Sequence, residues 1–409
     1  MGWRIQKLSS LCDTFTDGDW IESKDQSPEG VRLIQTGNVG EGVFKDRRHK
    51  SRFISIDTFN RLKCTEIFPG DCLVSRLPDP VGRSCVIPQT TDRMITAVDC
   101  TIIRLRKSQL LPEFFNYFTQ SYLYLVAVES LTSGATRKRI SRKNLGAVSI
   151  PTPPIPEQQR IVAILDQAFA DIEKARANAE QNLKNARELF DSYLQQVFSQ
   201  RGEGWVDKPL GDACTFSSGG TPSKKNSSYW IGNIPWVSGR DMKSTQLSDS
   251  LLHISQSAVN ESSTRMAPAG SLLILVRGMG LAHGAQVAEL TVPCTYNQDI
   301  KGIHPNSELV SRYLVFALRF QINCSDSILS SAAHGTLKID MAELKNVIIP
   351  VPPTNQQRNI VNRINSLNAE VNNLETIYKR KLKALTELKK SLLKKAFSGQ
   401  LTESKGIAA

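Results

Sequence analysis

PTPPIPEQQRIV, residues 151–162, places four prolines immediately before and within the start of a stretch with helical character, and PVPPTNQQRNIV repeats the pattern at residues 350–361. Proline fixes φ and keeps the preceding residue extended, so each stretch predicts a short, stiff connection into a helix. The two stretches lie 199 residues apart in a chain of 409 residues. Solenoid repeats span only about 20–50 residues. The sequence therefore predicts a duplicated unit, a whole domain followed by a helix.

The match between the copies extends beyond the prolines. Residues that recur at the same offset are Leu145, Val148, Gln158, Ile161, Glu188 and Phe198, which correspond to Leu344, Val347, Gln357, Ile360, Glu387 and Phe397. We therefore divide the chain into a first domain at residues 1–150, its helix at 151–200, a second domain at 201–349 and a second helix at 350–409. Short β-like runs broken by Gly, Pro, Asn and Asp predict a mixed α/β (α+β) fold for both domains.

Particular elements can be predicted from these patterns. The expected strands are Val31–Thr36, Cys72–Arg76, Ser84–Ile87, Thr101–Leu105, Ile234–Val237, Leu272–Val276 and Gln286–Leu290. The expected domain helices are Glu113–Val128 and Glu308–Phe320.

The two long predicted helices carry heptad seams. Across residues 161–193 and 360–392, seam positions recur in alternating steps of four and three, and nine of the ten positions in each copy are apolar or aromatic. Such a seam is typical of a coiled coil and predicts that the helices pair with each other. The polar seam positions, Asn182 and Lys381, are expected to be buried and to fix the register.

The seams leave the direction of pairing open, parallel or antiparallel, and the alternative is that each helix packs on its own domain. Charge favours pairing, because residues 151–200 carry 5 Lys/Arg against 7 Asp/Glu, whereas residues 350–409 carry 11 against 4. A helix of about 38 residues would be roughly 57 Å long.

The net charge of +12 suits a polyanionic partner. The first domain has two basic clusters, FKDRRHKSRF at residues 44–53 and TRKRISRK at 136–143. Such clusters suit phosphate contacts, whose energy comes largely from counterion release. The residues expected to bind nucleic acid in this domain are Lys45, Arg47, Arg48, Lys50, Arg52, Arg76, Arg83, Arg137, Lys138 and Arg139.

The second domain has almost no net charge, but residues 219–243 mix cations with Tyr229, Trp230 and Trp236. We favour a core position for the two tryptophans. Residues 271–284 place glycines after a strand, and because another strand follows, a hairpin is favoured over a nucleotide-binding turn. The DNA-contact candidates of this domain are Thr221, Lys224, Lys225, Ser238, Arg240, Lys243, Arg277 and His283.

Missing motifs exclude several kinds of site. The phosphate-loop pattern GxxxxGK[ST] and the zinc pattern HExxH are absent, and the eight cysteines form no CxxC pair. The cysteines are therefore interpreted as small buried hydrophobes. No apolar run of about 20 residues and no apolar signal core occur, so we expect a cytoplasmic protein without membrane contact. No catalytic residue, cofactor or metal is expected in this chain.

Together these motifs closely resemble the specificity subunits of type I restriction-modification systems. The residues that carry the resemblance are the PPxxxQ(Q/R) helix entries (Pro153–Gln159 and Pro352–Arg358), the GGTPS…YW…IPW opening (Gly219–Trp236), the GAT…IS turn (Gly134–Ser141) and the AFSGQL ending (Ala396–Leu401).

The resemblance implies two target recognition domains, each reading half of a split DNA sequence, and an antiparallel coiled coil that spaces them. It also implies partners: two methyltransferase subunits carrying S-adenosylmethionine, and restriction (motor) subunits, bound through them, that use ATP and Mg. This chain would supply no chemistry. The residues expected to bind partners are Gln158, Ile161, Leu165, Phe198, Gln357, Ile360, Ile364 and Phe397.

A rod of roughly 57 Å suits two half-sites centred about one DNA turn, 34–36 Å, apart. Two other classes of function are alternatives to a DNA-reading specificity subunit. The first is a stand-alone S-adenosylmethionine-dependent DNA methyltransferase, which is disfavoured because the tetrapeptide (N/D)PP(Y/F) is absent. The second is a coiled-coil scaffold that does not read DNA.

Overall fold

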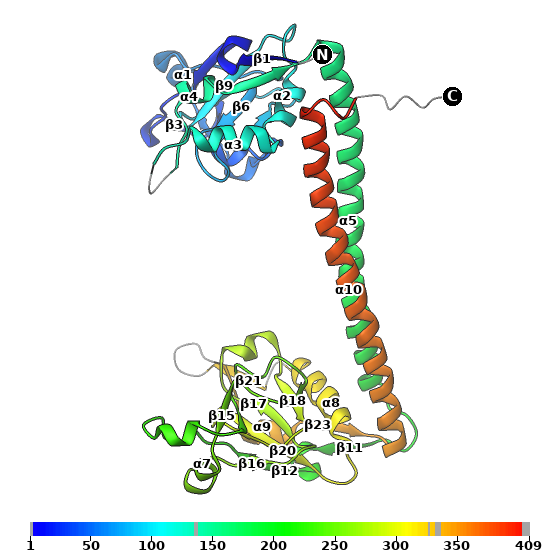
Figure 1. Ribbon diagram of the computed structural model, residues 1–409. Coiled ribbons are helices and arrows are strands. Elements are labelled where there is room, and N and C mark those ends of the chain that lie inside the picture. Colours follow the sequence, from blue (N-terminus) through cyan, green and yellow to red (C-terminus); the bar gives the residue numbers. More distant parts are fainter. Residues whose placement is uncertain (1–2, 135–137, 326–327, 332–336, 403–409) are drawn as a thin grey trace, which may run out of the picture. The chain divides into compact units, whose positions relative to one another are not determined.

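A computed structural model describes residues 3–134, 138–325, 328–331 and 337–402 (Figure 1). The chain forms two compact units: unit 1 contains residues 1–181 and 378–409, and unit 2 contains residues 182–377. Each unit holds one β-rich domain and parts of two long helices, α5 (Ile155–Ser199) and α10 (Thr354–Phe397). The prediction of two mixed α/β domains, each followed by a long helix, is confirmed.

The domain of unit 1 contains two four-stranded sheets, with strand orders β2-β9-β6-β7 and β3-β5-β4-β8. Strands β4 and β8 pair in parallel, and the other neighbours are antiparallel. The strands are β2 (Cys12–Asp17), β3 (Gln26–Ser27), β4 (Val31–Ile34), β5 (Arg52–Ile54), β6 (Cys72–Ser75), β7 (Ser84–Val86), β8 (Met94–Thr96) and β9 (Cys100–Leu105). The helices are α1 (Ile56–Leu62), α2 (Pro112–Phe118), α3 (Tyr122–Ser130) and α4 (Arg142–Gly146), with short turns η1 (Leu8–Leu11), η2 (Ser23–Asp25), η3 (Thr36–Asn38) and η4 (Arg48–Lys50).

The domain of unit 2 has a five-stranded sheet of order β12-β20-β17-β18-β14 and a four-stranded sheet of order β15-β13-β19-β16. The strands are β12 (Cys214–Ser218), β13 (Ile234–Val237), β14 (Gln246–Leu247), β15 (Leu252–Ile254), β16 (Met266–Ala267), β17 (Leu272–Leu275), β18 (Val287–Leu290), β19 (Cys294–Tyr296), β20 (Ile300–Pro305), β21 (Leu329–Ser331) and β22 (Leu337–Ile339). The helices are α6 (Leu210–Ala213), α7 (Gln256–Glu261), α8 (Ser311–Asn323) and α9 (Met341–Asn346), with turns η5 (Ser227–Trp230) and η6 (Met279–His283).

Each domain ends in a two-stranded antiparallel ribbon that leads into its long helix. In unit 1 the ribbon pairs β1 (Arg4–Lys7) with β10 (Ser149–Thr152), and in unit 2 it pairs β11 (Val206–Pro209) with β23 (Ile348–Val351). The first proline of each junction lies in the ribbon, where a strand with one free edge tolerates the missing N–H. The stiff connection predicted from the prolines is thus partly a β-ribbon that returns to the beginning of the domain.

The helices α5 and α10 pack together, and the direction can be read within each unit. In unit 1 the beginning of α5 shares a core with the end of α10, through Leu165 and Phe397 among others. In unit 2 the end of α5, including Phe198, shares a core with Val361 and Ile364 near the beginning of α10. Beginning meets end in both units, so the pairing is antiparallel, as the family resemblance implies.

Several details differ from the sequence-based expectations. The long helices have 45 and 44 residues rather than about 38, because each begins directly after its Pro-Pro pair. The expected buried polar break is wrong, since both Asn182 and Lys381 are exposed. The single helix expected across residues 113–128 is split into α2 and α3, because the buried Ser121 caps a new helix by accepting the Tyr124 N–H at 3.3 Å.

Other expectations are confirmed. Strands β17 and β18 form the antiparallel hairpin expected around the glycine loop. Trp236 is buried, and Trp230 is partly buried against it with ring centroids 5.0 Å apart. Seven of the eight cysteines are buried, and Cys324 is the exposed exception. Burial raises the pKa of the Cys12 thiol to about 12, which fits an inert packing role.

Candidate nucleic-acid interface

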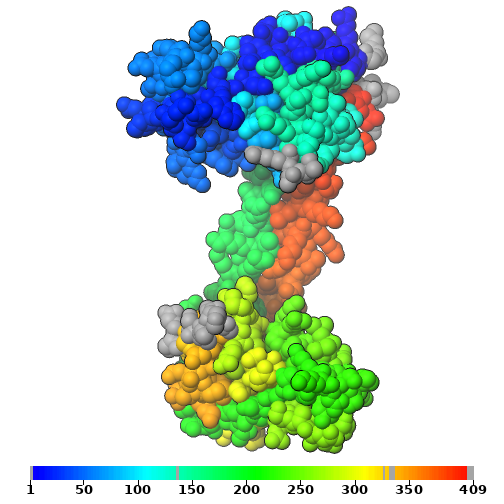
Figure 2. Space-filling view, turned by 90° about the vertical axis from the view of Figure 1, so that its left-hand side faces the viewer, coloured from blue at the N-terminus to red at the C-terminus, as the bar shows by residue number. Residues whose placement is uncertain are grey.

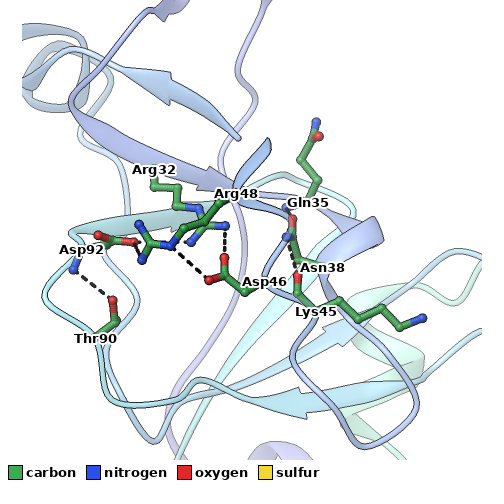
Figure 3. A network of polar contacts seen from close by, with 8 residues as sticks. All are labelled: Arg32, Gln35, Asn38, Lys45, Asp46, Arg48, Thr90 and Asp92. Atoms are coloured by element: carbon green, nitrogen blue, oxygen red, sulfur yellow. Dashed lines mark hydrogen bonds and ion pairs between the residues drawn. The ribbon is translucent and has the colours of Figure 1, made fainter. Parts of the chain in front are cut away.

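The basic segment at residues 45–52 of unit 1 starts from a fixed backbone (Figure 3). The Nδ2 of Asn38 donates to the Lys45 carbonyl at 2.9 Å, and the Lys45 N–H donates to the Asn38 carbonyl at 2.8 Å. The Oδ1 of Asn38 accepts the N–H of Gln35 at 3.0 Å. An amide this engaged and buried is costly to displace, so it holds the start of the segment against the domain.

A ring of four alternating charges holds the middle of the segment (Figure 3). Arg32 projects from β4 with a side chain only 4% exposed, and it pairs with Asp46 and, at 3.4 Å, with Asp92. Arg48 closes this charge ring from the solvent side, with its Nε 3.1 Å from Asp46 Oδ2 and its Nη2 2.8 Å from Asp92 Oδ2. The hydrogen bond from Arg32 is the main cause that lowers the pKa of Asp46.

Four further cations of this segment are exposed: Lys45, Arg47, Lys50 and Arg52. None of them makes an ion pair with another described residue. In the space-filling view, the blue residues from the first quarter of the chain form much of the visible surface of unit 1 (Figure 2). Uncompensated, exposed cations on a fixed loop are suited to phosphate contacts.

The second basic cluster of unit 1 is largely paired. Lys138 forms an ion pair with Glu129, and Arg139 Nη2 lies 3.0 Å from Asp99 Oδ1. Both side chains are nevertheless about half exposed. Arg137 lies outside the described residues.

Arg76 and Arg83 are used inside the first domain. Arg76 is 5% exposed and its Nη2 donates to the Val98 carbonyl at 2.6 Å, and burial lowers its pKa. The guanidinium of Arg83 donates to the carbonyls of Thr36 at 2.9 Å and Val39 at 2.7 Å, among others. These hydrogen bonds join loops of the domain, so buried Arg76 and partly buried Arg83 both support its structure.

The candidates of the second domain divide in the same way. Thr221 Oγ1 donates to Gln298 Oε1 at 2.6 Å, and Ser238 Oγ donates to Asp241 Oδ2 at 2.8 Å, so both hydroxyls are engaged in their loops. The remaining candidates are exposed: Lys224, Lys225, Arg240, Lys243, Arg277 and His283. These hydroxyls and cations all come from connections between strands, where adaptable contacts are expected.

The two glutamines predicted to bind partners, Gln158 and Gln357, are buried and link helix to domain, and we call them the glutamine latches. Gln158 is 0% exposed; its Nε2 donates to the carbonyls of Gln109 and Pro153, both at 2.8 Å, and its Oε1 accepts the Leu111 N–H at 2.9 Å. Gln357 repeats all three contacts in unit 2, to Glu308 at 2.8 Å, Pro352 at 2.8 Å and Val310 at 2.8 Å. Each amide joins a long helix to the domain that precedes it.

The apolar members of the partner-binding set are also inside the chain. Ile161, Leu165, Phe198, Ile364 and Phe397 are buried, and Ile360 is partly buried. The Phe397 ring lies 5.3 Å from that of Phe114, and the Phe198 ring lies 5.8 Å from that of Tyr313, measured between centroids. These side chains fix the helix ends on the domains and leave other helix faces to solvent.

Arg32, Asp46, Asp92 and Asn38 were missed by the sequence reasoning. One signal was available, because VRLI places an arginine within an otherwise apolar strand, and a buried arginine requires carboxylate or carbonyl partners. The described residues contain no group of three or more His, Cys, Asp or Glu side chains placed to hold a metal ion. Nor does any described helix have the length and hydropathy needed to cross a membrane.

These features define a class of protein. It has two repeated β-rich domains, each joined by a buried glutamine to one of two antiparallel helices, and exposed cations on the domain loops. The family model for the type I restriction modification DNA specificity domain matches residues 1–181 and 202–384. The chain therefore belongs to this family, and the prediction that it is a specificity subunit, the non-catalytic subunit class, is confirmed.

Individual relatives agree. The chain is 33% identical over 266 residues to the type I restriction enzyme EcoR124I/EcoR124II specificity subunit of Escherichia coli, covering 62% of this chain and 64% of the relative. It is 23% identical to the EcoKI specificity subunit of Escherichia coli strain K12, covering 74% and 68%. The match thus spans less than two thirds of the first relative's length.

Solved structures show the same fold. The HsdS subunit from Thermoanaerobacter tengcongensis superimposes with a TM-score of 0.64 at 20% identity, covering 98% of this chain and 97% of that one. A chain from a study of complex assembly and conformational transition of the type I R-M system gives a TM-score of 0.77 at 21% identity, covering 98% of both chains.

Proposed function

We propose that this chain reads a bipartite, gapped DNA target for a type I restriction-modification complex. The domains at residues 1–150 and 201–349 each read one half of the target. The helices within residues 151–200 and 350–409 serve as the spacer between them. The target bases within each half are contacted by loop side chains, and the gap is not read.

The observation that carries the proposal is that the chain contains the same domain-and-helix architecture twice, with exposed cations on the loops of both domains. A protein that reads two separate half-sites needs two reading surfaces held by a defined connection. The repeated latches of Gln158 and Gln357 supply that connection in each unit. The phosphate contacts fall to the exposed cations and not to Arg76 or Arg83.

The partners we propose are two methyltransferase subunits, with restriction subunits bound through them, in the cytoplasm. S-adenosylmethionine, ATP and Mg belong to those partners. Because the eight partner-binding candidates on the helices are mostly buried in this chain, we assign them an indirect part. They fix the helix surfaces on which a partner subunit docks.

Selection from a pool of duplexes with 20 randomised base pairs tests this function, with the purified full chain alone and with its methyltransferase subunits. The expected result is enrichment of two short sequence blocks at constant spacing. Insertion of one base pair into the gap should then abolish the preference, because it rotates one half-site away from its domain. A single contiguous block, or tolerance of the insertion, would contradict the proposal.

A further inference from the structure

We propose that Arg48 reads a base edge, a guanine in the half-site of the first domain, and that Arg32, Asp46 and Asp92 are the residues that position it. The inference rests on the proposed function and names one specificity-determining contact within it. It divides the basic segment at residues 45–52 into a base-reading arginine and phosphate-binding neighbours.

The free hydrogen-bonding capacity of Arg48 fits this role. A guanidinium carries five N–H groups. The Nε–H and one N–H of Nη2 are taken by Asp46 and Asp92 at 3.1 Å and 2.8 Å. The other three N–H groups remain, and the side chain is 64% exposed. Two of them suffice for a bidentate contact with O6 and N7 of guanine in the major groove.

The two carboxylates that hold Arg48 are themselves held. Buried Arg32 pairs with both of them, from the centre of a sheet whose neighbouring strands are β5 and β8. The Asp92 N–H also donates to Thr90 Oγ1 at 3.1 Å, which fixes the loop before β8. An exposed arginine normally loses side-chain entropy when it binds, and positioning from behind lowers that cost. Figure 3 shows these groups converging on Arg48 from separate strands and loops.

The charge of the ring separates Arg48 from its neighbours. Two arginines and two aspartates sum to zero, and a carboxylate close to the DNA backbone would repel phosphate. Lys45, Lys50 and Arg52 have no such compensation among the described residues. Phosphate attraction therefore falls to the uncompensated cations, which position the protein without reading sequence. A neutralised but well-oriented guanidinium contributes discrimination between bases instead.

The test uses duplex selection by the full chain with its methyltransferase subunits, comparing wild type with Arg48→Ala, Arg48→Lys and Asp92→Asn. Arg48→Ala should remove the preference for guanine at one position of one block, a loss of roughly five- to hundredfold in discrimination. Arg48→Lys should lose most of it, because an ammonium lacks the planar fork of N–H groups that can bind Asp46, Asp92 and a base at once. Asp92→Asn should give a smaller loss at the same position.

Lys50→Ala is the matched control, because this exposed cation lies two residues away and outside the charge ring. It should weaken binding to every duplex equally and reduce the slope of log K against log salt by about 1. The other positions of the first block should be unchanged in all variants, which verifies that the first domain is folded, and so should the block read by the second domain.

The inference is overturned if Arg48→Ala leaves every base preference intact, or if it behaves like Lys50→Ala, while the wild-type chain still selects two blocks. Failure of the proposed function looks different, because then the wild-type chain itself selects no bipartite sequence.

Discussion

The two units match where a domain meets its helix and differ inside their sheets. Gln158 and Gln357 make the same three hydrogen bonds, and Phe397 and Phe198 pack against the same part of their domains. These shared contacts hold a long helix, and both copies need them for the same reason. Whatever each domain reads has to be set elsewhere.

One position inside the sheets shows how far the copies have diverged. In unit 1, Arg104 on β9 makes a bidentate ion pair with Asp71, at 2.9 Å and 2.8 Å. At the equivalent places in unit 2, His304 on β20 contacts Ser271 through Nδ1 at 2.9 Å. The first unit thus has an ion pair between permanently charged groups at a place where the second unit has a titratable imidazole bonded to a hydroxyl. The contacts that hold the long helix are thus the same in both units, whereas the polar contacts within the sheets differ.

The largest expected effect is a loss of stability when the contacts that hold the long helices, which both units share, are removed. Phe397→Ala and Phe198→Ala should each lower the free energy of unfolding by about 3–5 kcal/mol, because each leaves a cavity beside an aromatic cluster. Chemical denaturation of both variants measures this. Leu388→Ala, which removes a side chain 47% exposed on α10, is the control and should cost far less. A silent Phe198→Ala alone would show that the two helix ends are not equivalent.

The glutamine latches should come next. Gln158→Ala and Gln357→Ala each leave a buried N–H and two carbonyls without their partner, and an unsatisfied buried group costs about 1–3 kcal/mol. We expect similar losses of unfolding free energy for the two variants, measured by denaturant titration. The exposed Gln159→Ala is the matched control, with an effect within about 0.5 kcal/mol. A loss of unfolding free energy in only one of the two variants would show that the two glutamines do not have equivalent roles.

The domain surfaces should differ more modestly, and in DNA binding only. Replacing Lys45, Lys50 and Arg52 together with alanine should lower the salt slope for a nonspecific duplex by up to about 3, because each phosphate that is no longer neutralised lowers it by about 0.9. The same change at Lys224, Lys225 and Lys243 should have a smaller effect, because the second domain carries little net charge. Fluorescence anisotropy across a salt series measures both slopes. An equal drop would show that net charge does not distinguish the two domains.

The smallest effect concerns pH. Burial lowers the pKa of His304 from its ordinary value of 6.5, so the folded state favours the neutral ring. The unfolded chain then binds the proton first, and the stability of unit 2 is fully present above pH 6.5 and falls as the pH drops below it. The hydrogen bond with Asp71 raises the pKa of Arg104, so unit 1 should show no corresponding change.

Calorimetric measurement of stability between pH 8 and 5 checks this. His304→Gln should remove the step, which is the fall in the stability of unit 2 below pH 6.5, and the exposed His283→Gln should retain it. A step that persists in His304→Gln would assign the titration to another group.

Much of this organisation could be predicted from the sequence, because repetition and heptad spacing are local patterns. The duplication, the helix pairing and the β17–β18 hairpin all follow from such patterns. The roles of Gln158 and Arg32 could not be found in that way. Gln158 acts through backbone groups about 50 residues away, and Arg32 through Asp46 and Asp92 on separate loops. Counting cations also cannot distinguish exposed Lys50 from buried Arg76, because burial is decided by tertiary packing.

Mapping of methylated adenines in the DNA of a host that carries the complete system tests the central claim most directly. The account predicts two short sequence blocks separated by a gap of constant length without base preference. Arg48→Ala should alter one block and leave the other unchanged. A single uninterrupted block, or simultaneous change of both blocks, would contradict the assignment of one half-site to each domain.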